Sequence, residues 1–80
     1  MASAGTWKIN ASTQVLVDLD KVHRYRVCSS ESSKGNKVEL RVDGTSYEIK
    51  PGTCRDVKGK KIEMYQGGGN DSMGTYDNLD

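Results

Sequence analysis

The segment KVELRVDGTSYEIK, residues 37–50, constrains the fold more than any other part of the chain. Its central dipeptide, Asp43-Gly44, tolerates positive φ at both positions and predicts a two-residue type I′ turn within a β-hairpin. Counting outward from this turn places the large apolar residues of both strands on one face. The predicted cross-strand pairs on that face are Val42–Thr45, Leu40–Tyr47 and Val38–Ile49. We therefore expect one face of the hairpin to join the core and the other to face solvent.

The solvent-facing side of this hairpin carries charged residues. Glu39 is expected to lie directly opposite Glu48, which is unfavourable by itself. Arg41 lies on a diagonal from which it can offset the repulsion. These charges are typical of a solvated surface and match no chemical motif.

Apolar and polar residues also alternate along several other short segments, which turn signals separate. These segments are residues 7–9, 15–19, 23–27, 53–57 and 62–65. Turns are predicted at Asp20-Lys21, at Pro51-Gly52 and at Lys58-Gly59-Lys60. At the first of these, Leu19 would pair with His23 across a three-residue loop. The pattern therefore predicts an all-β fold, a small antiparallel β-sandwich or barrel of about six or seven short strands.

The core of such a fold would be small. A chain of 80 residues buries only about 60 to 65% of its unfolded surface. Leu, Ile and Val supply 14 of the 80 residues and Phe none, a share that is typical of disordered chains. The net charge of only +1 and the clean alternation favour a folded domain instead. We therefore expect a disulfide, a metal or a neighbouring subunit to supplement the core.

The composition of the chain changes near residue 66. Residues 1–66 are predicted to form a single small β domain, with residues 1–5 as a flexible N-terminal arm. Residues 67–80 form a Gly-rich acidic extension without Lys or Arg. Its apolar residues, at three-residue spacing, and its acids are Met73, Tyr76 and Leu79, and Asp71, Asp77 and Asp80. The extension is either a disordered tail or an arm that finds no internal strand and docks on a neighbouring subunit through these six residues.

Cys28 and Cys54 are the only cysteines, and both lie on predicted strands. A disulfide between them would stabilise the fold by about 3 kcal/mol through the entropy of the unfolded chain. Two buried free thiols, each acting as a small core residue, would fit the pattern equally well. Two cysteines and one histidine do not supply the four ligands of a structural zinc site, so we expect no metal and no cofactor.

The sequence offers no convincing catalytic group. His23 precedes Cys28 by five positions, so strand alternation points the two side chains to opposite faces, whereas a cysteine nucleophile needs its base within hydrogen-bond reach. Asp18 and Asp20 share a face but lack the glycine and the distal glutamate of a calcium loop. We therefore predict no catalytic residue and do not expect an enzyme.

Basic residues suggest single-stranded nucleic-acid binding as an alternative. They are Arg24 and Arg26 on one segment and Lys58, Lys60 and Lys61 on another. Tyr25 lies between the arginines, and OB-type domains bind single strands with basic grooves and aromatic platforms. Alternation points the Tyr25 ring into the core, however, where no base could stack on it. Nucleic acid is therefore not the partner we expect.

The expected function follows by elimination. The N-terminus, MASAGTWKIN, does not have the pattern of a signal peptide, and no segment is apolar over a membrane-spanning length. We expect a virion or cytoplasmic location and no membrane insertion. The profile suggests a non-enzymatic structural protein, a repeated accessory part of a larger complex such as a phage capsid decoration or cement protein, with protein partners. The alternatives are the OB-like nucleic-acid-binding domain and a secreted ligand- or carbohydrate-binding module.

Overall fold

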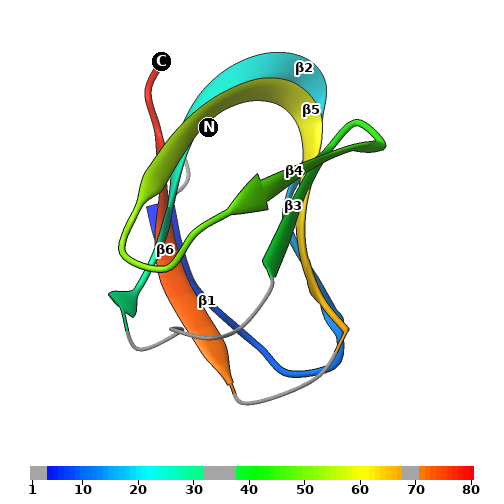
Figure 1. Ribbon diagram of the computed structural model, residues 1–80. Coiled ribbons are helices and arrows are strands. Elements are labelled where there is room, and N and C mark those ends of the chain that lie inside the picture. The colour runs from blue at the N-terminus through cyan, green and yellow to red at the C-terminus, as the bar shows by residue number, and fades with distance from the viewer. Residues whose placement is uncertain (1–3, 32–37, 68–70) are drawn as a thin grey trace.

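The computed structural model describes residues 4–31, 38–67 and 71–80, which contain one antiparallel β-sheet (Figure 1). The strands in these residues are β1 (Ala4–Ile9), β2 (Thr13–Ser29), β3 (Val38–Val42), β4 (Thr45–Ile49), β5 (Cys54–Gln66) and β6 (Ser72–Asn78). Across the sheet, their order is β1-β6-β2-β5-β3-β4. The prediction of a small all-β antiparallel fold is confirmed. Within the same residues, no helix is long and apolar enough to cross a membrane.

Strands β2 and β5 are long and strongly bent. They form an arch between the side of the sheet that contains β1 and β6 and the side that contains β3 (Figure 1). The two strands pair over two stretches, residues 13–18 with 61–65 and residues 23–28 with 54–59. Between the stretches the register shifts, because residues 19–22 of β2 lie opposite Lys60 alone. An insertion of this kind increases the local bend of a strand pair.

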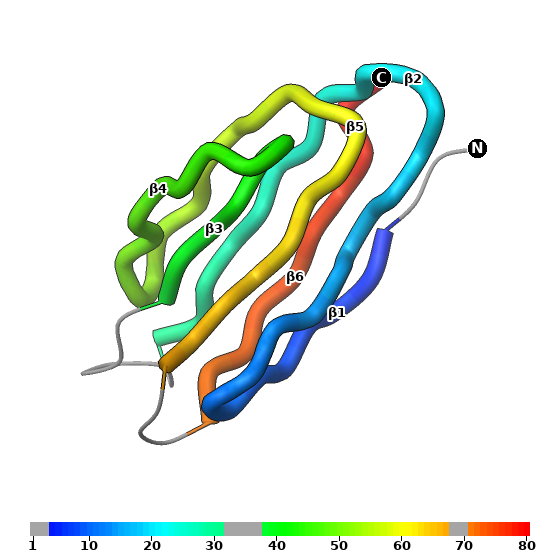
Figure 2. The backbone as a smooth tube through the Cα atoms, turned by 90° about the vertical axis from the view of Figure 1, so that its right-hand side faces the viewer, coloured from blue at the N-terminus to red at the C-terminus, as the bar shows by residue number. Residues whose placement is uncertain are grey.

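The bend divides the sheet into two halves (Figure 2). The β1–β6 half contains β1, β6, residues 23–29 of β2 and residues 54–59 of β5. The β3–β4 half contains β3, β4, residues 13–18 of β2 and residues 61–66 of β5. Both long strands therefore belong to both halves.

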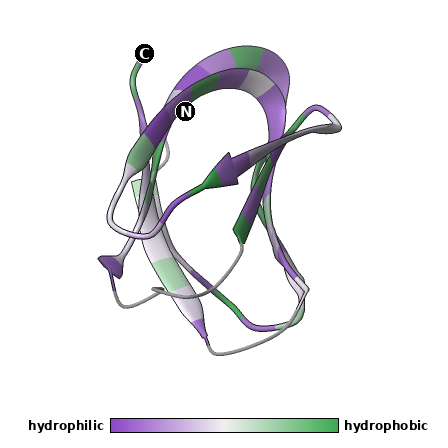
Figure 3. Cartoon of the chain, in the orientation of Figure 1, coloured by the Kyte–Doolittle hydropathy of each residue, from purple (hydrophilic) through white to green (hydrophobic). Residues whose placement is uncertain are grey.

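The core is one cluster to which both halves contribute. Its buried members are Trp7, Ile9, Tyr25 and Val27 from the β1–β6 half, and Leu16, Val17, Val38, Leu40, Val42, Ile49, Ile62 and Met64 from the β3–β4 half. Figure 3 shows hydrophobic and hydrophilic residues alternating along the arch of β2 and β5. This alternation gives each long strand an inner face toward the core and an outer face toward solvent.

The predicted hairpin at residues 37–50 is confirmed as β3 and β4. All three predicted apolar pairs occur, and Leu40 is fully buried opposite Tyr47. Asp43 and Gly44 both have positive φ, 49° and 87°, as a type I′ turn requires. The Pro51-Gly52 turn is also present, with the Thr53 backbone N donating to the Lys50 carbonyl oxygen at 3.1 Å.

Two other predicted turns are wrong. The chain does not reverse at Asp20-Lys21, so Leu19 does not pair with His23, and β2 continues to Ser29. It does not reverse at residues 58–60 either, because these lie inside β5. Gly59 allows close packing, because a Cβ at this position would lie only 2.5 Å from Val42 Cγ1. The break in the apolar pattern marks the bend of the two strands instead of chain reversals.

Strand β6 contradicts the expectation that the extension has no internal strand to pair with. Its residues pair with β1 along residues 4–9 and with residues 25–29 of β2, so β6 lies inside the sheet. Both partners are distant in the sequence, and the local pattern carries no sign of them. The predicted N-terminal arm overlaps β1 at residues 4 and 5, while residues 1–3 and 68–70 lie outside the described residues.

Candidate functional site

Most of the predicted site residues lie on the outer face of the β1–β6 half. Residues that lie opposite each other on β6, β2 and β5 form rows across this face. One row is Asp77–Arg26–Asp56, and the next is Thr75–Cys28–Cys54. Arg24 lies directly opposite Lys58. The register therefore makes the two cysteines, two arginines and one lysine neighbours on one surface.

Arg26 forms a bidentate ion pair with Asp56. Arg26 Nε donates to Asp56 Oδ1 at 2.8 Å, and Arg26 Nη2 donates to Oδ2 at 3.0 Å. The hydrogen bond holds the pKa of Asp56 below its ordinary value and raises the pKa of Arg26. Asp77, on the other side of Arg26, adds a further electrostatic attraction. The positive charge of Arg26 is therefore balanced by nearby carboxylates.

Asp80 binds both the side chain and the backbone of Arg24. Arg24 Nε donates to Asp80 Oδ1 at 3.0 Å, and the Arg24 backbone N donates to Oδ2 at 3.1 Å. His23 Nδ1 lies 3.0 Å from the same Oδ2. Hydrogen bonds from the side chain and then the backbone of Arg24 lower the pKa of Asp80. Asp80, predicted to contact a partner, is thus engaged within the chain.

The three lysines of the alternative nucleic-acid surface are exposed and lie along β5. Lys58 lies beside Arg24, whereas Lys60 and Lys61 lie at the bend. The backbone N atoms of Lys61 and Lys60 donate to the Asp43 carboxylate at 2.9 and 3.1 Å and lower its pKa. Tyr25 is fully buried, as the alternation predicts, and offers no platform for a base. The sequence pattern gave no sign that Asp43 would reach β5.

Cys28 and Cys54 form a disulfide between directly opposed positions of β2 and β5. Of the two alternatives for these residues, the structure therefore has the bridge. Cys54 is exposed and Cys28 is half-buried, and neither belongs to the core cluster. The bridge therefore lies on the outer face of the sheet, outside the core cluster.

The six residues predicted to dock on a partner are divided by the structure. Tyr76 packs against the core, and Leu79 is half-buried, with its backbone N donating to the Arg24 carbonyl oxygen at 2.8 Å. Asp71 accepts a hydrogen bond from Asn10 Nδ2 at 2.9 Å and lies 3.4 Å from Lys8 Nζ. These contacts, that of Asn10 first, lower the pKa of Asp71. The set does not form one surface.

Unlike Tyr76 and Leu79, the other apolar residues of this set, Met73 is exposed, at 37% of its surface. It lies at a surface hollow of about 350 Å³, which we call the Met73 hollow. The hollow is lined by Thr6, Trp7, Lys8, Ser30, Met73, Gly74 and Thr75. The sequence pattern indicates none of these as site residues except Met73, because the pairing of β6 with β1 and a hydrogen bond from the Ser30 backbone N to the Met73 carbonyl oxygen bring them together.

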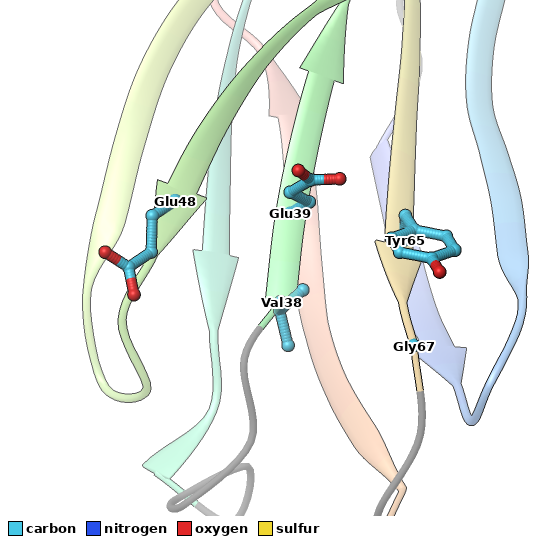
Figure 4. A pocket seen from close by; sticks show the side chains of 5 residues that line it. All are labelled: Val38, Glu39, Glu48, Tyr65 and Gly67. Atoms are coloured by element: carbon cyan, nitrogen blue, oxygen red, sulfur yellow. The ribbon is translucent and has the colours of Figure 1, made fainter.

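A second hollow, of about 440 Å³, lies in the β3–β4 half (Figure 4). It is lined by Val38, Glu39, Glu48, Tyr65 and Gly67. Glu39 and Glu48 are opposed, as predicted, but Figure 4 shows their carboxylates pointing in different directions. Arg41 Nη2 donates to Glu39 Oε2 at 2.9 Å, and the guanidinium lies 4.3 Å from the Tyr65 ring centre. The two carboxylates therefore do not form an acid–base pair aimed at one ligand.

The described residues contain no group of three or more His, Cys, Asp or Glu side chains that could hold a metal ion. Arg24, Arg26 and Asp71 take part in ion pairs, and Cys28 and Cys54 form a disulfide. Comparison with known proteins gives no match to a protein-family model, a curated protein or a solved structure.

Proposed function

We propose that this chain is a non-enzymatic β module that serves as a repeated accessory part of a larger protein assembly, such as a virion decoration or cement protein. The observation that supports the proposal is the Met73 hollow. Its occupant is a neighbouring protein subunit that inserts an apolar side chain beside Met73.

The surface around Met73 suits protein contact. The side chain is flexible and polarisable, and methionine adapts to the shape of a partner. Thr6 and Thr75 lie opposite each other beside it and present short hydroxyl side chains, and Lys8, which lies directly opposite Met73, is paired with Asp71. A subunit that covered this surface would add apolar burial to a chain whose own core is small.

The charge pairs on the outer face count against the nucleic-acid alternative. A phosphate backbone is held by Lys and Arg side chains that exchange counterions for phosphates. Arg24 and Arg26 already have carboxylate partners in Asp80 and Asp56. Nucleic acid would have to displace or tolerate both carboxylates, which weakens its electrostatic attraction to this face.

The disulfide favours the secreted ligand-binding module as a second candidate. Disulfides persist in oxidising compartments and are rare in the cytosol. The ligand would occupy the hollow at Glu39, Glu48 and Tyr65, which lies in the other half of the sheet from Met73. The two candidates therefore predict contacts at different surfaces.

The test is site-specific cross-linking in the cells or particles from which the protein comes. A photoreactive residue replaces Met73 in one variant and Val22 in another; Val22 is a matched control because it is apolar, 45% exposed and located at the bend. We expect position 73 to cross-link to one protein partner or to a second copy, and position 22 not to do so. No protein adduct at position 73, or equal adducts at both, would count against the proposal.

A further inference from the structure

We propose that Cys28 and Cys54 form a reversible redox site that exchanges with small thiols and disulfides while the sheet stays folded. The two residues are directly opposed on neighbouring strands and lie on the outer face. Cys54 is exposed, so a small thiolate can reach the bridge from solvent. Solvent-accessible disulfides are the ones that exchange most readily.

The fold holds the two cysteines opposite each other without needing the bridge. On one side, the Arg26–Asp56 ion pair occupies the adjacent row, and Val27 pairs with Arg55. On the other side, the Ser29 backbone N donates to the Thr53 carbonyl oxygen at 2.9 Å. Because backbone pairing sets the register on both sides, the two thiols of the reduced form stay in position for oxidation.

Opening the bridge also leaves the core intact. Neither cysteine belongs to the buried cluster, and the residues that flank Cys28 on β2 with inward side chains, Val27 and Ser29, stay paired with β6. Reduction therefore removes a cross-link between two residues outside the core cluster. The reduced chain keeps its sheet but loses the constraint that the bridge places on the unfolded state.

The co-reactant in this exchange is a small thiol of the glutathione type, which supplies the two electrons that reduce the bridge. A thiolate attacks one sulfur of the bridge, forms a mixed disulfide and releases the other cysteine as a thiolate, which takes a proton from solvent. A second thiol then attacks the mixed disulfide and frees the first cysteine. Two small thiols are oxidised to one small disulfide, and the protein disulfide is reduced to two thiols. Oxidation follows the same steps in reverse.

The experiment equilibrates the full chain in buffers that range from reduced to oxidised glutathione. After acid quenching and alkylation, mass spectrometry counts the free thiols, and circular dichroism reports the sheet. We expect complete conversion between the bridged and the two-thiol forms in both directions, with the same β-sheet spectrum at room temperature. The midpoint of thermal unfolding should fall by about 15 to 25 °C on reduction, from the lost entropy constraint on a chain of this size.

The control is the double variant Cys28→Ser with Cys54→Ser. Its thermal midpoint should resemble that of the reduced protein and should not depend on the glutathione ratio. The proposal is overturned if the folded bridge resists excess reduced glutathione, if the reduced chain loses its sheet spectrum, or if the oxidised buffer does not restore the bridge. A double variant that unfolds at room temperature would also contradict it.

Discussion

The β3–β4 hairpin and strand β6 belong to different halves of the sheet, and their pairing partners lie at very different distances along the sequence. The hairpin strands are joined by one two-residue turn, so closing them costs little chain entropy. Strand β6 pairs with residues 4–9 and 25–29, which are far away in the sequence. Its position therefore depends on tertiary packing, and contacts of this kind are slow and costly to form.

The hairpin and β6 each require a glycine, but for different structural reasons. Gly44 in the hairpin turn has no atom near the place of a Cβ, and its role is the positive φ of 87°. Gly74 in β6 has no room for a Cβ, which would overlap the Cys28 carbonyl oxygen and lie 2.6 Å from Trp7 Cζ2. The hairpin is thus specified by backbone conformation, and β6 is specified by the space between its neighbours.

The largest loss of folding stability should come from adding a side chain at Gly74 in β6. Gly74→Val is expected to cost at least about 4 kcal/mol, because the added atoms overlap backbone as well as the buried Trp7 ring. Chemical denaturation, followed by Trp7 fluorescence, measures the loss. The control is Gly67→Ala, where the nearest atom to the new Cβ would be 3.4 Å away. If Gly74→Val is as stable as Gly67→Ala, the placement of β6 is wrong.

Truncation in the hairpin should have the next largest effect. Leu40→Ala removes a fully buried side chain that packs in the core, and it should cost about 2 to 4 kcal/mol. Urea unfolding measures the loss, and Ser46→Ala on the exposed face of β4 is the control. A loss below about half a kcal/mol would contradict the assignment of this face to the core.

A smaller effect is expected from the hairpin turn. Gly44→Val should cost about 1 to 2 kcal/mol, since a β-branched residue resists positive φ although the site has space for it. Gly44→Asn is the matched control, because asparagine tolerates this conformation better. Thermal unfolding compares the three proteins. Equal midpoints for the Val and Asn variants would mean that backbone strain does not limit this turn.

The smallest loss of folding stability should appear when the pH is lowered. The pKa values of Asp71 and Asp80, at the two ends of β6, and of Asp43, which joins the hairpin to β5, are all lowered in the fold. A lowered folded-state pKa means that the stabilisation is complete above the unfolded value, about 3.9, and is lost as pH falls through the folded value. Thermal midpoints should therefore decline below about pH 4.

Single substitutions assign this acid dependence to the two regions. Asp80→Asn should flatten the decline by removing the β6 carboxylate, and Asp43→Asn should flatten it by removing the hairpin carboxylate while tolerating positive φ. Each change should be modest because all three carboxyl groups are exposed. If neither substitution changes the dependence on pH, other carboxyl groups are responsible for it.

The sequence alone predicts the all-β antiparallel class and the register of the β3–β4 hairpin, because the Asp43-Gly44 turn and period-two alternation act over a few residues. It also placed Tyr25 in the core for the same local reason. It left open whether Cys28 and Cys54 are bridged, since their distance depends on the pairing of β2 with β5.

The place of β6 in the sheet, and the contacts of its residues, depend on long-range pairing. The segment around Met73, Tyr76 and Leu79 has too few apolar residues to indicate a buried strand, and its partners are set by the free edges of β1 and β2. The same holds for the bend of β2 and β5, where a break in alternation resembles a turn. The local residue pattern indicates which face of a strand is apolar. Whether the chain turns or bends where the pattern breaks depends on the neighbouring strands.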